Sequence, residues 1–182
     1  HRVAVQVAGG PAPAVRNLTV NSSCGLCGRT DIEALIDGMK PVAGDIRVDA
    51  RVLYEVPDRV RKAQPLFQAS GGTHAAALFD ASGKLLVVRE DIGRHNALDK
   101  IIGYALLSSV SMAGVGVFLS GRTSLEMVLK AARAQIPLVA AVSAPTAAAV
   151  QAARRAGITL CGFVRGDEIT VYTHDERIAQ AV

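Results

Sequence analysis

The sequence predicts an α/β fold with a central, largely parallel sheet that carries helices on both faces. From residue 115 onward, continuous apolar runs alternate with segments of helical spacing, which is the pattern of strands buried on both faces. The chain has 182 residues and 50% hydrophobic content, enough for one domain or for one domain with an appendage. Only 4% of the residues are aromatic and tryptophan is absent, so the core must consist mainly of Ala, Val, Leu and Ile.

The first 48 residues are predicted to form an N-terminal region of their own. Residues 2–7 have the composition of a strand, and residues 9–13 form a turn rich in glycine and proline. The pattern Thr30-Asp31-Ile32-Glu33 is a capping box, so a short helix should cover residues 31–37 and end at Gly38. Because the chain begins at His1 and not at methionine, we expect that it lacks an N-terminal portion of the natural protein.

Residues 49–182 are predicted to form the α/β core. Residues 49–68 have helical spacing, and Pro57 marks a start or a kink of that helix. Two strands joined by a hairpin turn at Asp80-Ala81-Ser82-Gly83 come next, after which helices and strands alternate. In chain order the predicted strands are 73–79, 84–89, 115–119, 138–142, 158–164 and 168–172, and the predicted helices after the hairpin are 96–110, 123–135 and 146–156.

The charge and the cysteine content narrow the class of protein. A formal charge of +4 favours anionic partners, but there is no dense basic run, and the closest, Arg59-Val60-Arg61-Lys62, is interpreted as a solvated helix face. The sequence shows no signal peptide and no apolar run of about twenty residues. Three cysteines do not make a disulfide framework. We therefore expect a soluble protein of a reducing compartment, the cytoplasm.

The segment around Cys24 and Cys27 is the strongest candidate for reactive chemistry. The two thiols lie two residues apart between glycines, and Arg29 favours the thiolate form, which is the nucleophile. The spacing fits half of a zinc site, a thioredoxin-like dithiol, or a loop that carries sulfur as a persulfide. A second ligand pair for zinc is missing, but spacing does not separate the other two. Cys161 lies in an apolar run and is interpreted as a small buried hydrophobe.

Small and polar residues follow the predicted strands repeatedly. Since ligands bind at the carboxyl ends of strands in such sheets, these loops predict a pocket. Backbone N–H groups at helix starts and arginine side chains suit phosphates, so the expected ligand is a polyphosphate or a nucleotide. His95 lies between two acids and an arginine, which favours a ligand role. The loops are Gly71-Gly72-Thr73-His74, Glu90-Asp91-Ile92-Gly93-Arg94-His95-Asn96, Ser120-Gly121-Arg122-Thr123, Ser143-Ala144-Pro145-Thr146 and Arg165-Gly166-Asp167.

Four long motifs follow one another along the chain: Ser22-Ser23-Cys24-Gly25-Leu26-Cys27-Gly28, Phe67-Gln68-Ala69-Ser70-Gly71-Gly72-Thr73-His74, Glu90-Asp91-Ile92-Gly93-Arg94-His95-Asn96-Ala97-Leu98-Asp99-Lys100 and Ser120-Gly121-Arg122. In this order they resemble the FdhD family of formate dehydrogenase accessory proteins.

The resemblance implies a three-layer sandwich similar to the cytidine deaminases, with a flexible N-terminal loop that holds the Cys-x-x-Cys pair. The sequence lacks the His-x-Glu and Pro-Cys-x-x-Cys motifs of zinc deaminases, which argues against deamination.

The same resemblance implies a sulfurtransferase that uses a cysteine persulfide and no metal of its own. Sulfur would come from a cysteine desulfurase and pass to the molybdenum bis(guanine dinucleotide) cofactor of formate dehydrogenase. Cys24 would bear the persulfide and Cys27 would assist. The family's cofactor-binding segment matches Phe163-Val164-Arg165-Gly166-Asp167-Glu168, and Gly71, Gly72, His74, Arg94, His95, Ser120, Gly121 and Arg122 are the further candidate contacts.

Arg94, Arg122 and Arg165 are expected to line one pocket that faces the cysteine loop. We expect a homodimer through the apolar helix at residues 101–107, and neither nucleic acid nor membrane as a partner. The alternative is a non-catalytic chaperone that holds the cofactor and uses the cysteines for structure or for a metal.

Overall fold

The computed structural model describes Ile36 and residues 38–179. They belong to one compact unit, which extends over Asp31–Val182. The predicted first strand, the cysteine segment and nearly all of the predicted first helix lie outside the described residues.

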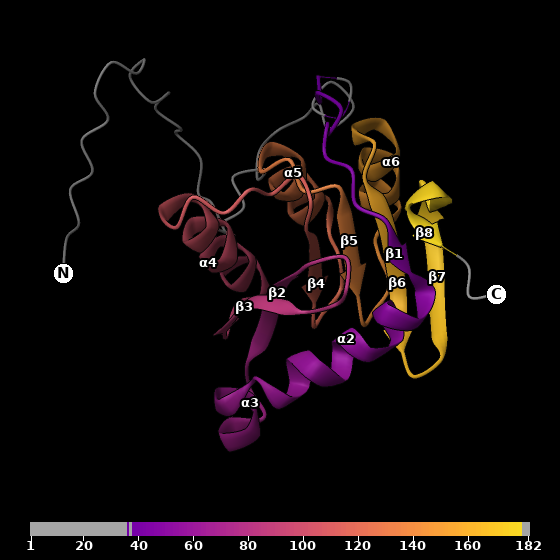
Figure 1. Cartoon of the computed structure of the whole chain (residues 1–182). Coiled ribbons are helices and arrows are strands. Elements are labelled where there is room, and N and C mark those ends of the chain that lie inside the picture. Colours follow the sequence, from indigo (N-terminus) through magenta and orange to yellow (C-terminus); the bar gives the residue numbers. More distant parts are fainter. Residues whose placement is uncertain (1–35, 37, 180–182) are drawn as a thin grey trace, which may run out of the picture. The chain divides into compact units, whose positions relative to one another are not determined.

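A six-stranded mixed sheet forms the centre of this unit (Figure 1). The three central strands run parallel, and antiparallel strands flank them on both sides, so parallel pairing is confined to the middle. Strand order across the sheet is β3-β2-β4-β5-β6-β7. The strands are β2 (His74–Phe79), β3 (Leu85–Asp91), β4 (Gly116–Leu119), β5 (Leu138–Ala141), β6 (Thr159–Arg165) and β7 (Glu168–Thr173). The six strands predicted between residues 73 and 172 are all present, with bounds that shift by one or two residues.

Helices cover both faces of the sheet, as predicted. The helices α4 (Arg94–Leu107), α5 (Leu125–Arg133) and α6 (Ala147–Ala156) pack in sequence on one face. Helix α2 (Ala50–Lys62) lies on the opposite face, and the short α3 (Pro65–Ser70) follows it (Figure 1). Within the described residues, no helix combines the length and the apolar character needed to cross a membrane.

Helix α2 begins at Ala50, so Pro57 lies inside it and does not start it. Asp49 caps the helix, because its carboxylate accepts a hydrogen bond from the Arg51 backbone N–H at 2.8 Å. The predicted single helix over 49–68 breaks at Ala63 and Gln64, and α3 begins at Pro65.

A second, two-stranded sheet packs beside α2. Strand β1 (Val48–Asp49) pairs in parallel with β8 (Ile178–Ala179), which follows the 3-10 turn η1 (Asp175–Arg177). Ile46 and Val48 are buried in the core beside α2. The described core therefore includes residues on both sides of position 49.

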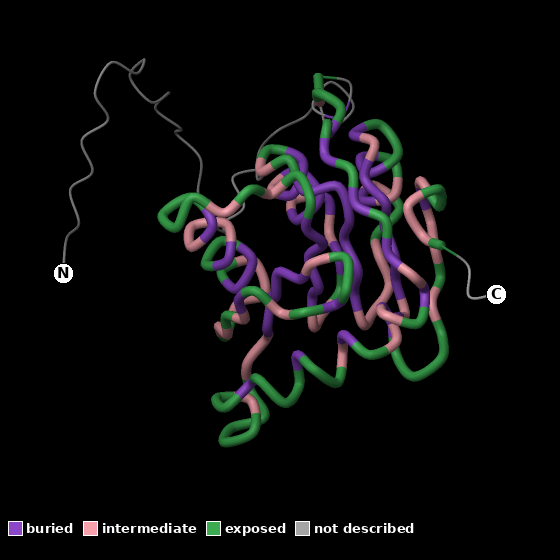
Figure 2. Tube along the Cα trace, viewed as in Figure 1, coloured by how far each residue is buried: buried purple, intermediate pink, exposed green. Residues whose placement is uncertain are grey.

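The core fills both faces of the sheet, and Figure 2 shows burial concentrated along the strands and the inner sides of the helices. On the α2 face it contains the rings of Phe79 and Phe118. The Phe79 ring occupies the space that a side chain at Gly116 would need, since a Cβ there would lie 2.4 Å from Cζ of the ring. Cys161 belongs to the same cluster, as predicted, and burial raises the pKa of its thiol to about 12.

Candidate functional site

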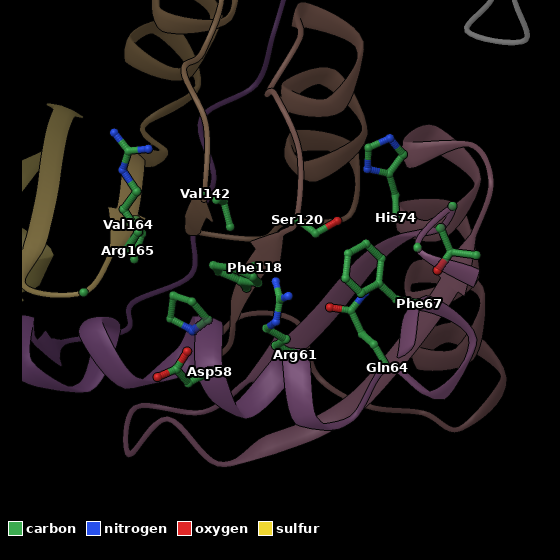
Figure 3. A pocket seen from close by; sticks show the side chains of 15 residues that line it. Asp58, Arg61, Gln64, Phe67, His74, Phe118, Ser120, Val142, Val164 and Arg165 are labelled. Atoms are coloured by element: carbon green, nitrogen blue, oxygen red, sulfur yellow. The ribbon is translucent and has the colours of Figure 1, made fainter. Parts of the chain in front are cut away.

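A pocket of about 440 Å³ opens at the carboxyl ends of β4, β5 and β6, on the face covered by α2 (Figure 3). Ser120 follows β4, Val142 follows β5 and Arg165 ends β6, so the carboxyl ends of the three parallel strands all contribute to this pocket. The lining residues are Pro57, Asp58, Arg61, Gln64, Phe67, Gly71, Gly72, Thr73, His74, Phe118, Ser120, Val142, Val164, Arg165 and Gly166. The pocket thus brings together three of the predicted loops.

The arginines and the histidine of the pocket have unused hydrogen-bond donors. In residues 38–179, the side chains of Arg61, Arg165 and His74 form no hydrogen bond or ion pair. By contrast Arg59, which does not line the pocket, pairs with Glu55. Two arginines face the pocket against one acidic side chain, Asp58. An arginine whose donors are free can bind phosphate with two parallel hydrogen bonds, so the pocket suits an anionic ligand.

Each of the two arginines rests on an aromatic ring. The Arg61 guanidinium carbon lies 5.3 Å from the centroid of the Phe67 ring, and that of Arg165 lies 5.7 Å from the centroid of Phe163. Such cation–π contacts fix the position of a guanidinium without using its N–H donors.

A β-bulge at the end of β6 aims two consecutive residues at the pocket. Phe163 has a φ of 53°, in the left-handed region, and the pairing of β6 with β7 shifts between Gly162 and Arg165. Successive residues of a regular strand point to opposite faces. Because of the bulge, both Val164 and Arg165 line the pocket, whereas Phe163 supports Arg165 from outside it.

Glu90 holds the α3 wall of the pocket in place. Its carboxylate accepts hydrogen bonds from the backbone N–H groups of Leu66 at 2.9 Å and Phe67 at 2.7 Å, and from the Thr73 hydroxyl at 2.8 Å. Burial on its own would raise the pKa of Glu90, but these bonds and one from Gln64 outweigh it and lower the pKa. Glu90 therefore caps α3 and does not act on His95.

The environment of His95 differs from the prediction. Its Nε2 lies 3.1 Å from the Ser124 hydroxyl and 4.0 Å from the Glu126 carboxylate, and His95 is not among the pocket-lining residues. Burial, followed by the charge of Arg94, lowers its pKa, so the ring is neutral at pH 7. Asp91, its other predicted neighbour, instead pairs with Lys100.

Asp91 has a structural role at the start of α4. Lys100 lies 2.6 Å from its carboxylate, and the Gly93 N–H and the Asn96 amide also donate to it. The Lys100 hydrogen bond is the largest of the effects that hold the pKa of Asp91 at about 2.

The remaining predicted residues do not line the pocket. Gly121 lies beside His74, since a Cβ at Gly121 would approach the imidazole ring to 3.3 Å and the Arg94 side chain to 3.8 Å. The Arg94 Nε is buried and has no hydrogen-bond partner. The other members of this group, outside the lining, are Arg122, Phe163, Asp167 and Glu168. Of the three arginines expected to share a pocket, only Arg165 lines this one.

The sequence interpretation missed the wall that α2 and α3 contribute. Arg59, Arg61 and Lys62 are exposed, as expected of a solvated helix face, but Arg61 also lines the pocket together with Pro57, Asp58, Gln64 and Phe67. Positions 57, 61 and 64 follow helical spacing, which was the available signal for a shared face. Cys24 and Cys27 lie outside the described residues, so their position relative to the pocket stays a prediction.

Comparison with known proteins gives consistent matches. The chain matches the FdhD/NarQ family over residues 2–179. It is 44% identical over 165 residues to the sulfur carrier protein FdhD of Saccharolobus solfataricus, which covers 90% of this chain and 63% of that protein. The protein of the same name from Streptomyces avermitilis is 46% identical over 172 residues, covering 90% of this chain and 60% of the relative.

A solved structure is also similar. The crystal structure of a protein described as a formate dehydrogenase accessory protein, from Desulfotalea psychrophila, superposes with a TM-score of 0.74 at 31% identity. The match covers 81% of this chain and 62% of that one. The chain therefore spans less than two thirds of the length of each of these three relatives.

Proposed function

Because this chain belongs to the FdhD/NarQ family, we propose that it is a cytoplasmic sulfur carrier for the maturation of formate dehydrogenase. The names of its relatives support sulfur carriage, and the description of the structural neighbour supports formate dehydrogenase as the enzyme served. We also propose that the three-layer core is of the cytidine-deaminase kind, that a flexible loop bearing Cys24 and Cys27 precedes it, and that the chain acts as a homodimer.

The observation from this chain's own residues that supports the proposal is the pocket with two unpaired arginines. Its volume of about 440 Å³ falls within the usual range of small-molecule sites. Arg61, Arg165 and His74 offer donors that no described residue uses. In our proposal this pocket binds part of the molybdenum bis(guanine dinucleotide) cofactor, which carries pyrophosphate groups and guanines and is here the substrate that receives sulfur.

The sulfur step begins at Cys24 in this proposal. Its thiolate attacks the outer sulfur of a persulfide on a cysteine desulfurase, the sulfur–sulfur bond of the donor breaks, and the donor leaves as a thiolate. Cys24 then carries the persulfide. The Cys27 thiolate then attacks the inner sulfur of the Cys24 persulfide, so the sulfur–sulfur bond breaks, a Cys24–Cys27 disulfide forms and the terminal sulfur leaves as sulfide for the cofactor. A thiol reductant then reduces the disulfide and restores both cysteines.

Mass spectrometry tests the loading step. The chain is incubated with a cysteine desulfurase and cysteine, and peptides are examined for the added mass of one sulfur atom. We expect this mass on Cys24 in the wild type and in Cys27→Ala, and no loading in Cys24→Ala. Cys161 is a built-in internal control, since its burial keeps it unreactive. Full loading of Cys24→Ala would overturn the assignment.

Isothermal titration with GDP tests the pocket. Arg165→Ala is expected to weaken binding, because it removes a cation whose donors face the pocket. Arg133→Ala is the charge-matched control, since this exposed arginine ends α5 and does not line this pocket. Equal affinities in both variants would remove the pocket from the proposal.

The alternative function is that of a chaperone that binds the cofactor without sulfur chemistry. In that case the cysteines serve structure or bind a metal. Activation of formate dehydrogenase that survives the double change Cys24→Ala and Cys27→Ala would favour this alternative over sulfur transfer.

A further inference from the structure

We propose that Arg61 and Phe67 form a ring-stacking wall, which takes the planar purine of a nucleotide ligand while Arg165 takes its phosphates. This inference rests on the function proposed above and assigns parts of one pocket to parts of the ligand. Figure 3 shows Phe67 and Arg165 on opposite sides of the pocket, with Arg61 beside Phe67.

The geometry of the two side chains supports this assignment. The Arg61 guanidinium lies over the Phe67 ring at 5.3 Å from its centroid, so a flat cation and a flat ring already share one wall. Nucleobases stack on aromatic rings and on guanidinium planes, because both present flat and polarisable faces. Arg61 makes no hydrogen bond through its guanidinium to any described residue, so stacking on it breaks no existing bond.

The apolar lining indicates a ligand larger than a phosphate group. Phe118, Val142, Val164 and Pro57 face the pocket together with the two arginines. A bare phosphate would leave these apolar walls without a partner, because it interacts through charge and hydrogen bonds alone. A purine nucleotide has an apolar, planar part and an anionic part, which match the two kinds of lining.

The attachment of Phe67 allows the wall to be tested by substitution. Phe67 is half-buried at the end of the pocket, and its backbone N–H is bound by Glu90 at 2.7 Å. Replacing the ring should leave the capped α3 in place, since the capping bond uses the backbone and not the side chain. Thermal melting of each variant checks that the fold is kept.

The experiment compares a ligand that has a ring with one that has none. A fluorescent guanine nucleotide bound to the chain is displaced by GDP or by inorganic pyrophosphate, in the wild type and in variants. Phe67→Leu should weaken the affinity for GDP by at least about fivefold and leave the affinity for pyrophosphate unchanged. Phe67→Tyr should restore GDP affinity. Leu66→Ala, which alters an exposed neighbour outside the pocket, should change neither.

Tryptophan fluorescence gives a direct readout of stacking. Because the chain contains no tryptophan, Phe67→Trp introduces a single fluorophore at the wall. GDP should quench this fluorescence and pyrophosphate should not. An unchanged affinity for GDP in Phe67→Leu would overturn the inference. An equal loss of affinity for GDP and for pyrophosphate in this variant would overturn it as well.

Failure of the proposed function gives a different result. If the wild-type chain binds no guanine nucleotide, the pocket assignment fails as a whole, and the wall with it. If the wild type binds GDP and Phe67→Leu binds it equally well, only the stacking wall is wrong.

Discussion

Gly116→Ala tests the tight packing between β4 and the Phe79 ring. The methyl group would lie 2.4 Å from Cζ of Phe79, whereas ordinary contacts begin at 3.4 Å, so the ring or the strand must move by about 1 Å. Phe79 is fully buried, and Phe118 and Leu138 belong to the same cluster, so the ring has little room. The substitution therefore overpacks the core.

Overpacking of this kind costs about 1–3 kcal/mol. For a chain of this length each kcal/mol lowers Tm by about 2–4 °C, so Gly116→Ala should lower Tm by about 2–12 °C. Replacing glycine by alanine is otherwise stabilising where the backbone allows it, because it restricts the unfolded chain. A net loss of stability in Gly116→Ala is thus a direct sign of the clash.

Thermal melting and urea denaturation measure the effect. Gly114→Ala is the matched control two residues away, since a Cβ there meets no atom within 4 Å, and its Tm should stay close to that of the wild type. Phe79→Leu frees space, so the double variant with Gly116→Ala should recover at least about 0.5 kcal/mol relative to additivity. Equal stability of Gly116→Ala and Gly114→Ala would refute the reasoning.

Three further predictions concern buried or capping groups. In a variant with Cys24→Ala and Cys27→Ala, iodoacetamide should label Cys161 only after denaturation, because with a pKa of about 12 roughly one thiol in ten thousand is ionised at pH 8; mass spectrometry detects the label, and fast labelling of the folded chain would contradict this. The pKa of His95 is lowered by folding, so the unfolded chain takes up its proton first as pH falls through about 6.5, and stability is lost there. His95→Gln should show a smaller difference in urea midpoint between pH 7.5 and 5.5, and a difference as large as in the wild type would argue against it. Glu90→Ala should cost about 0.5–2 kcal/mol in urea denaturation through loss of the α3 cap and should weaken GDP binding, and unchanged values in both assays would disprove its positioning role.

Much of the fold could be predicted from the sequence because its elements are locally encoded. The hairpin at 80–83 and the strands over 115–119 and 138–142 were identified from turn residues and continuous apolar runs. The break in the helix over 49–68 had a local signal, because Pro65 disfavours helical backbone at Gln64 and takes the first position of α3. The cap that Glu90 gives to α3 comes from 26 residues beyond Gln64, so no local pattern could show it.

The site was predictable only in part, for a related reason. Loops after parallel strands meet at one edge for topological reasons, so Ser120 and Arg165 could be expected to share a pocket. Arg61 reaches the same pocket because α2 crosses the sheet, and no local pattern encodes that crossing. The φ of 53° at Phe163 is likewise invisible in a segment that has the composition of a regular strand.

The two sides of the pocket should differ in how readily they open. Val164 and Arg165 lie at the end of β6, where Arg165 pairs with Glu168 of β7, and β6 also pairs with β5 further along, whereas α3 has six residues, buries none of them fully and is tied to the sheet chiefly through Glu90. A helix this short has no stability of its own, so α3 can detach by local opening at a small fraction of the free energy of global unfolding. A bound nucleotide would then be released in order, with the ring freed first by the motion of α3 and the phosphates last from the sheet. The residence time of the ligand would therefore depend on a single carboxylate that never touches it.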